Sequence, residues 1–179
     1  IKSNSNLSKT RISKGFSIMS ELPRYMFQDV CFMNEQFGNP KGDKSSINWP
    51  KLNNQCGNIL DEYEELQEAL LREDPTHVRD ALCDIMVFTL GAYHFLGYDA
   101  NKDMQAVFES NMSKLCTTSE EIVKTVDYYT RNGVKVYTEG ELPFVCVKSL
   151  CAQTGKDGKN FPKDKFLKNI NWREPQFEY

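Results

Sequence analysis

The feature that most restricts how this chain can fold is a twelve-residue run, ALCDIMVFTLGA at 81–92, that is apolar on almost every side. A helix that is apolar all round has to be covered by other helices. The run therefore predicts the central helix of a helical bundle. Asp84 lies in the middle of this run. Because burying a lone carboxylate costs several kcal/mol, Asp84 needs either a basic side chain or a metal ion beside it.

Apolar spacing and the residues that usually end helices predict five helices. They cover 21–37, 55–72, 75–96, 102–115 and 119–130. Residues 39–54 show little periodicity and are expected to form a loop. After Gly133, short β-prone stretches between turn residues predict a small hairpin and a loop-rich tail. The expected fold is mainly α, with a helical-bundle core of four to five helices and a small C-terminal β-hairpin and loop extension.

Composition divides the 179 residues into three parts. Residues 1–18 carry four basic residues, no acidic residue and many Ser and Asn, which predicts a flexible leader. Residues 19–132 would form the helical domain, and residues 133–179 a β- and loop-rich C-terminal extension.

Charge and cysteine content limit the classes of function. The net charge is −3, whereas proteins that bind duplex DNA usually carry a basic surface, so no duplex DNA partner is expected. No run approaches the roughly 18 apolar residues of a membrane span, so no membrane partner is expected either. Six cysteines without a CxxC spacing argue against structural zinc and favour a reducing, cytoplasm-like compartment.

Two carboxylates lie on one edge of the second predicted helix. Glu62 and Glu65 project about 60° apart on a polar strip beside the apolar stripe of that helix. Two carboxylates so placed can share a hard cation. If the second and third helices pack antiparallel across the short turn between them, Asp80 and Asp84 converge on the same pair. The four acids then predict a Mg²⁺ site.

Carboxylates around Mg²⁺ suit phosphoryl chemistry, because the ion binds phosphate oxygens and lowers the pKa of an attacking water. Such a substrate also needs a cationic partner, and Asn111 and Lys114 lie on one face of the fourth predicted helix. A structural alternative accounts for both groups. Arg72, Arg79 or Lys114 would pair with the carboxylates, or Lys114 would stabilise the C-terminus of its helix.

Three segments of the chain resemble the motifs of one family, in the family's order. They are LDEYEELQEA, DALCDIMVFTLGAYHFLGYD and ESNMSKL, preceded by MFQDVCFMNEQFGNP. Over about residues 24–116 the chain resembles the all-α nucleoside triphosphate pyrophosphohydrolases. Within that superfamily it is most similar to the MazG-like and phosphoribosyl-ATP pyrophosphohydrolase-like proteins, including those of phages and other viruses.

This resemblance implies Mg²⁺-dependent cleavage between the α and β phosphates, giving a nucleoside monophosphate and pyrophosphate, with Mn²⁺ as a substitute ion. The family's ExxE motif falls on Glu62 and Glu65, one of which would orient or deprotonate the water. Its later acidic motif falls on Asp84. Since Ala81 stands three residues before Asp84, Asp80 would replace the family's usual Glu. The implied metal ligands are thus all four acids.

The resemblance also implies where the substrate and further subunits bind. Asn111 and Lys114 match a pair that would bind phosphate or sugar. The basic tail, which includes Lys168, would close over the triphosphate, unless it is simply a solvated surface. Trp49 is a candidate for stacking on the base. A homodimer or homotetramer is expected, acting in the cytoplasm, or in the host cytoplasm for a viral member.

Two other functions are consistent with the same residues. A related enzyme would act on phosphoribosyl-ATP or dUTP, since nothing in the sequence fixes the base. A non-catalytic module would use the acids structurally and the basic tail to engage a nucleotide, RNA or a protein. The second alternative predicts no metal dependence and tolerance of Glu62→Gln.

Overall fold

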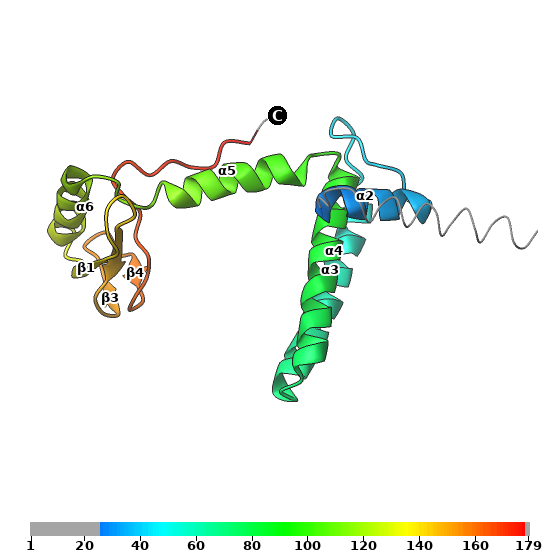
Figure 1. Cartoon of the computed structure of the whole chain (residues 1–179), viewed down its shortest axis with the longest axis horizontal. Coiled ribbons are helices and arrows are strands. Elements are labelled where there is room, and N and C mark those ends of the chain that lie inside the picture. Colours follow the sequence, from blue (N-terminus) through cyan, green and yellow to red (C-terminus); the bar gives the residue numbers. More distant parts are fainter. Residues whose placement is uncertain (1–25, 178–179) are drawn as a thin grey trace, which may run out of the picture. The chain divides into compact units, whose positions relative to one another are not determined.

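A computed structural model describes residues 26–177, and the leader predicted for residues 1–18 lies outside them. The described residues divide into two compact units, one up to Ala100 and the other from Asn101. Five helices and two short strand pairs lie within the described range (Figure 1). The prediction of a mainly α chain with a small C-terminal strand extension is therefore confirmed.

The first unit is a helical hairpin with a third helix packed against it. It comprises α2 (Met26–Gln36), α3 (Trp49–Leu71) and α4 (Pro75–Leu96). Helices α3 and α4 lie side by side and run antiparallel across a turn at residues 72–74, while α2 contacts α4 (Figure 1). Asp74 caps α4 by accepting hydrogen bonds from the backbone N–H groups of Thr76 and His77.

Helix α3 begins at Trp49, before the predicted start at residue 55. The prediction of a loop over residues 39–54 is wrong for its last residues, and Trp49 lies in the helix rather than in a loop. Asn48 caps the helix, because its side chain accepts a hydrogen bond from the Lys51 backbone N–H at 3.0 Å. Pro50 lies in the first turn, where proline is favourable, so it does not signal a loop here.

Small residues allow α3 and α4 to pack closely. Ala69 and Ala81 are 1% and 4% exposed, and Gly91 is also buried. At Gly91 the Gln55 carboxamide reaches across from α3 and donates a hydrogen bond to the Phe88 carbonyl oxygen at 3.0 Å. A Cβ atom at position 91 would lie only 2.7 Å from Gln55 Nε2. The contact between Gln55 and Gly91 therefore fixes how α3 and α4 are positioned relative to each other along their axes.

The second unit combines two helices with two small antiparallel sheets. Its elements are α5 (Ala100–Met112), α6 (Ser119–Arg131), β1 (Val136–Glu139), β2 (Cys146–Ser149), β3 (Gln153–Thr154) and β4 (Asn160–Phe161). Strands β1 and β2 form the predicted hairpin. Strands β3 and β4 form a second pair inside the segment that was expected to be loop.

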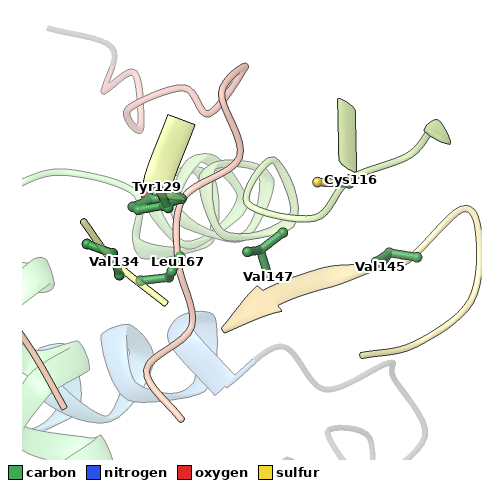
Figure 2. Close-up of a cluster of buried hydrophobic side chains, with 6 residues drawn as sticks. All are labelled: Cys116, Tyr129, Val134, Val145, Val147 and Leu167. Atoms are coloured by element: carbon green, nitrogen blue, oxygen red, sulfur yellow. The ribbon is translucent and has the colours of Figure 1, made fainter. Parts of the chain in front are cut away.

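The core of the second unit joins a helix, a hairpin and the tail (Figure 2). Tyr129 comes from α6, Val147 from β2 and Leu167 from the tail, and all three are buried. The expected domain boundary after Asn132 would separate α6 from the strands with which it shares this core. The division between the two compact units falls after Ala100.

Candidate functional site

The first two predicted carboxylates lie at the same level of the α3–α4 hairpin. Gln55 on α3 contacts α4 at Gly91. Glu62 lies seven residues after Gln55, and Asp84 lies seven residues before Gly91. Each is therefore two helical turns, or about 10 Å, closer to the turn that connects α3 and α4. Both side chains are partly buried. The antiparallel packing on which the predicted acidic cluster depends is therefore present.

The other two carboxylates lie about one turn closer to the connection. Glu65 is on α3 and Asp80 on α4, and both are exposed. Exposure leaves these two side chains free to change rotamer, since their χ angles are not fixed by packing. The cluster thus has a partly buried end and a solvent-exposed end.

The other acids of this cluster act electrostatically on Glu62. The pKa of the Glu62 carboxyl is raised above its usual value, first because partial burial disfavours the charged form, and second because neighbouring acids repel it. These acids are, in order of their effect, Glu65, Asp84, Asp80 and Asp61. Three of the four are the residues that the sequence placed with Glu62.

No basic side chain among residues 26–177 forms an ion pair with any of the four carboxylates. Arg72 and Arg79, which the structural alternative assigned to this role, leave the charge unbalanced. Across the same residues, no three Asp, Glu, His or Cys side chains form a closed set of metal ligands in the positions that they occupy. The donor chemistry is nevertheless that of a hard cation, because the cluster presents only carboxylate oxygens.

A buried polar strip continues from the carboxylates along the hairpin. Asn58 Nδ2 lies 3.5 Å from Gln55 Oε1, and Asn34 of α2 is only 9% exposed. His94 is fully buried with Nε2 3.0 Å from the Asn39 carbonyl oxygen, while its Nδ1 has no partner within the described residues. Sequence reasoning missed Asn34. Asn34 lies four residues after Val30, so helical spacing places it on the same buried face of α2. A polar residue on a buried face is informative, and this spacing was the available signal.

The predicted substrate-binding residues are divided between the two units. Trp49 is 67% exposed at the start of α3, in the first unit. In the second unit Lys114 Nζ donates a hydrogen bond to Asn111 Oδ1 at 2.6 Å. Lys114 and Lys168 line the same cleft of that unit. The structure therefore brings Lys114 together with both Asn111 and Lys168.

No family model matches the chain, and no curated protein matches it. The resemblance to the all-α pyrophosphohydrolases rests on the motifs of the chain itself. Within the described range no single helix is long and apolar enough to cross a membrane, and only α4 and α5 taken together reach the required length and apolarity.

Proposed function

We propose that this chain is a Mg²⁺-dependent nucleoside triphosphate pyrophosphohydrolase that acts in the cytoplasm. The observation that carries the proposal is the cluster of four carboxylates on α3 and α4, which no basic side chain of residues 26–177 balances. Crowded carboxylates without a counter-charge are unfavourable, and a divalent cation bound through oxygen ligands removes that cost. The family resemblance over residues 24–116 suggests the reaction, cleavage between the α and β phosphates.

The carboxylates have two roles in this proposal. Together, Glu62, Glu65, Asp80 and Asp84 would hold Mg²⁺, which when bound offsets phosphate charge and lowers the pKa of water. Water adds to one phosphorus of the α–β anhydride, and its proton passes to Glu62 or Glu65. The bridging P–O bond then breaks, so that pyrophosphate and the nucleoside monophosphate separate.

The substrate-binding part of the proposal rests on four further residues. Lys114 and Lys168 would neutralise phosphate oxygens, which is supported by their position in one cleft. Asn111, bonded to Lys114, would bind sugar or phosphate. Trp49 would stack on the base, since its ring is largely exposed.

Association of identical chains is also part of the proposal, as a homodimer or homotetramer. Helices α3 and α4 expose large apolar side chains that would normally be covered in a stable assembly. They are Leu60, Leu70, Leu71, Leu82 and Met86, with exposed fractions between 45% and 86%. A second copy of the hairpin would bury this surface.

The proposal is tested by resolving the products formed from the eight common NTPs and dNTPs in the presence of Mg²⁺. The expected products are monophosphate and pyrophosphate, and Glu65→Gln should lower the rate at least about 100-fold. Glu64→Gln is the matched control, because Glu64 is an exposed acid of the same helix and is not among the four acids that chiefly raise the pKa of Glu62. It should retain the rate within about twofold.

Other outcomes would change the assignment. Diphosphate and phosphate as products would contradict the proposed bond cleavage. No turnover, together with a Mg²⁺-dependent rise in melting temperature, would direct the assay to phosphoribosyl-ATP and to dUTP. No turnover and no effect of Mg²⁺ would favour the non-catalytic binding module.

A further inference from the structure

The second unit contains a cleft that none of the α3 or α4 carboxylates lines. Its volume is about 550 Å³, within the usual range of about 300–1,000 Å³ for pockets that hold small ligands. All of its lining residues lie between Lys114 and Trp172, inside one compact unit. Tyr129, Val134 and Leu167, which gather at one end of the core in Figure 2, form part of its lining.

One wall of the cleft is the tail segment 165–172, here called the tail strap. Leu167 and Asn169 are 2% and 5% exposed, whereas Phe166 and Lys168 are exposed. This alternation is that of an extended chain, whose successive side chains point to opposite sides. The Asn169 amide donates a hydrogen bond to the Leu115 carbonyl oxygen at 2.8 Å. The buried side chains of Leu167 and Asn169 fix the tail strap to the unit. The exposed residues Phe166 and Lys168 are therefore held in place along the cleft.

The cleft is lined by four lysines and one acid: Lys114, Lys159, Lys165, Lys168 and Asp157. Asp157 pairs with Lys159, with 3.1 Å between Oδ2 and Nζ. The other three lysines form no ion pair in the part of the chain that the structure describes. Unbalanced ammonium groups along a concave surface attract anions, and phosphate oxygens accept their hydrogen bonds.

Aromatic rings lie between these lysines. Lys168 Nζ is 3.1 Å from the centre of the Trp172 ring, and Lys165 Nζ is 5.5 Å from the centre of the Phe161 ring. The Trp172 Nε1 atom is buried and has no hydrogen-bond partner among residues 26–177. Phe166 also lines the cleft and is 38% exposed. Flat rings beside ammonium groups match a ligand that carries both an aromatic base and a phosphate.

We propose that this cleft binds a nucleoside phosphate, either as a free nucleotide or as part of a single-stranded oligonucleotide. Lys165 and Lys168 contact the phosphate, and Trp172 and Phe166 contact the base. The binding requires no acid of α3 or α4 and does not depend on the proposed hydrolysis. Lys114 and Lys168 of this cleft also belong to the proposed substrate-binding set, so binding and hydrolysis have to be measured separately.

Trp172 provides a direct readout of this binding. The chain has two tryptophans, so Trp49→Phe leaves Trp172 as its only one. In that background, with EDTA present to prevent divalent-ion-dependent turnover, AMP and ATP should change the Trp172 fluorescence saturably. Replacing Lys165 and Lys168 together by Gln should weaken binding at least about tenfold. Lys163→Gln, which removes one lysine charge from an exposed residue of the tail outside the cleft, should alter affinity less than about twofold.

An oligonucleotide of the same base identifies the source of the ligand. Tighter binding and a steeper salt dependence than for AMP would assign a single strand, and equal affinity would assign a free nucleotide. Either result supports a nucleoside phosphate ligand. The inference is overturned if AMP and ATP do not change the Trp172 fluorescence, or if pyrophosphate binds as tightly as ATP. It is also overturned if Lys163→Gln weakens binding as much as the double replacement of Lys165 and Lys168. Melting temperatures show that each variant is folded, and Glu65→Gln should lose hydrolysis while keeping cleft binding.

Discussion

Glu62 is the residue at which the two unfavourable properties of the acidic cluster combine. Partial burial removes water from its carboxylate, and the neighbouring acids repel it. Its pKa in the folded chain therefore lies above the unfolded value. The stability that it contributes is present below the unfolded pKa of about 4.3 and is lost as the pH rises through the folded pKa. At neutral pH the ionised Glu62 thus destabilises the metal-free protein.

We expect Glu62→Gln to raise the melting temperature of the metal-free protein at neutral pH, because it removes this repulsion. The gain in unfolding free energy should stay below about 1 kcal/mol, since the cluster is only partly buried. The variant should also lose most of the stabilisation by Mg²⁺, because one ligand is gone. Thermal unfolding with and without Mg²⁺ measures both effects. Glu64→Gln serves as control and should change neither, whereas an undiminished Mg²⁺ effect in Glu62→Gln would contradict the metal site.

Helix α4 and its neighbours show which elements can be predicted from sequence. The predicted and observed bounds of α4 agree because local residues set them: Pro75 begins the helix, and Gly97, with a φ of 80°, ends it. The start of α3 was missed because Pro50 suits a first helical turn as well as a loop. Strands β3 and β4 have only two residues each, which is too short to show the alternation of apolar and polar residues that predicts a strand. Their region is held by distant contacts, such as the two hydrogen bonds between the Gln153 side chain and the Lys135 backbone.

The same distinction applies to the sites. The acidic cluster was predictable because Glu62 and Asp84 are set by helical periodicity and one short turn. The cleft of the second unit was predictable only in its composition, as basic and aromatic residues of the tail. Its shape depends on Lys114 and Asn169, which lie 55 positions apart in the chain and are brought together by tertiary packing.

The start of α6 is joined to the tail by the Glu121 carboxylate. It accepts hydrogen bonds from the Thr117 backbone N–H at 2.6 Å and hydroxyl at 3.0 Å, and from the side-chain amides of Asn171 and Asn169. These bonds, chiefly that from the Thr117 backbone, lower the pKa of Glu121 to about 2. A lowered folded pKa contributes stability above the unfolded value of about 4.3, and this stability is lost as the pH falls toward 2.

Glu121→Gln should lower the free energy of unfolding by about 1–3 kcal/mol at neutral pH, because charged hydrogen bonds are replaced by neutral ones. It should also reduce the loss of stability between about pH 4.5 and about pH 3. Urea unfolding of the Trp49→Phe background, followed by Trp172 fluorescence, reports on the second unit. Glu120→Gln is the control, since Glu120 pairs with Lys124 at the exposed surface. If the free energy of unfolding depends on pH in the same way with Glu and with Gln at position 121, the stabilising role of the Glu121 carboxylate is refuted.

At the scale of the whole molecule, the apolar surface of α4 exceeds what α2 and α3 cover. The run 81–92 predicts a helix with neighbours on all sides, yet α4 packs against α2 and α3 only on part of its surface. Leu82 and Met86 remain 46% and 45% exposed, and Leu71 at the end of α3 is 86% exposed. The sequence thus predicts that other apolar side chains pack on this surface of α4, but it does not predict where those side chains come from. A second copy of this chain would supply them, because the same apolar surface is available on both partners.

We expect the wild-type chain to have the molar mass of a homodimer or homotetramer by light scattering, and the double variant Leu82→Glu, Met86→Glu to dissociate. The two positions are four residues apart and therefore lie on one face of α4. Burial of each side chain is worth about 1.5–3 kcal/mol, so losing both should raise the dissociation constant at least about 100-fold. Val123→Glu is the matched control, because Val123 is 64% exposed on α6 in the second unit, and it should keep the wild-type mass. A monomeric wild type, or a double variant that associates normally, would contradict association through α4. Circular dichroism distinguishes dissociation from unfolding, since a dissociated but folded variant keeps its helical signal.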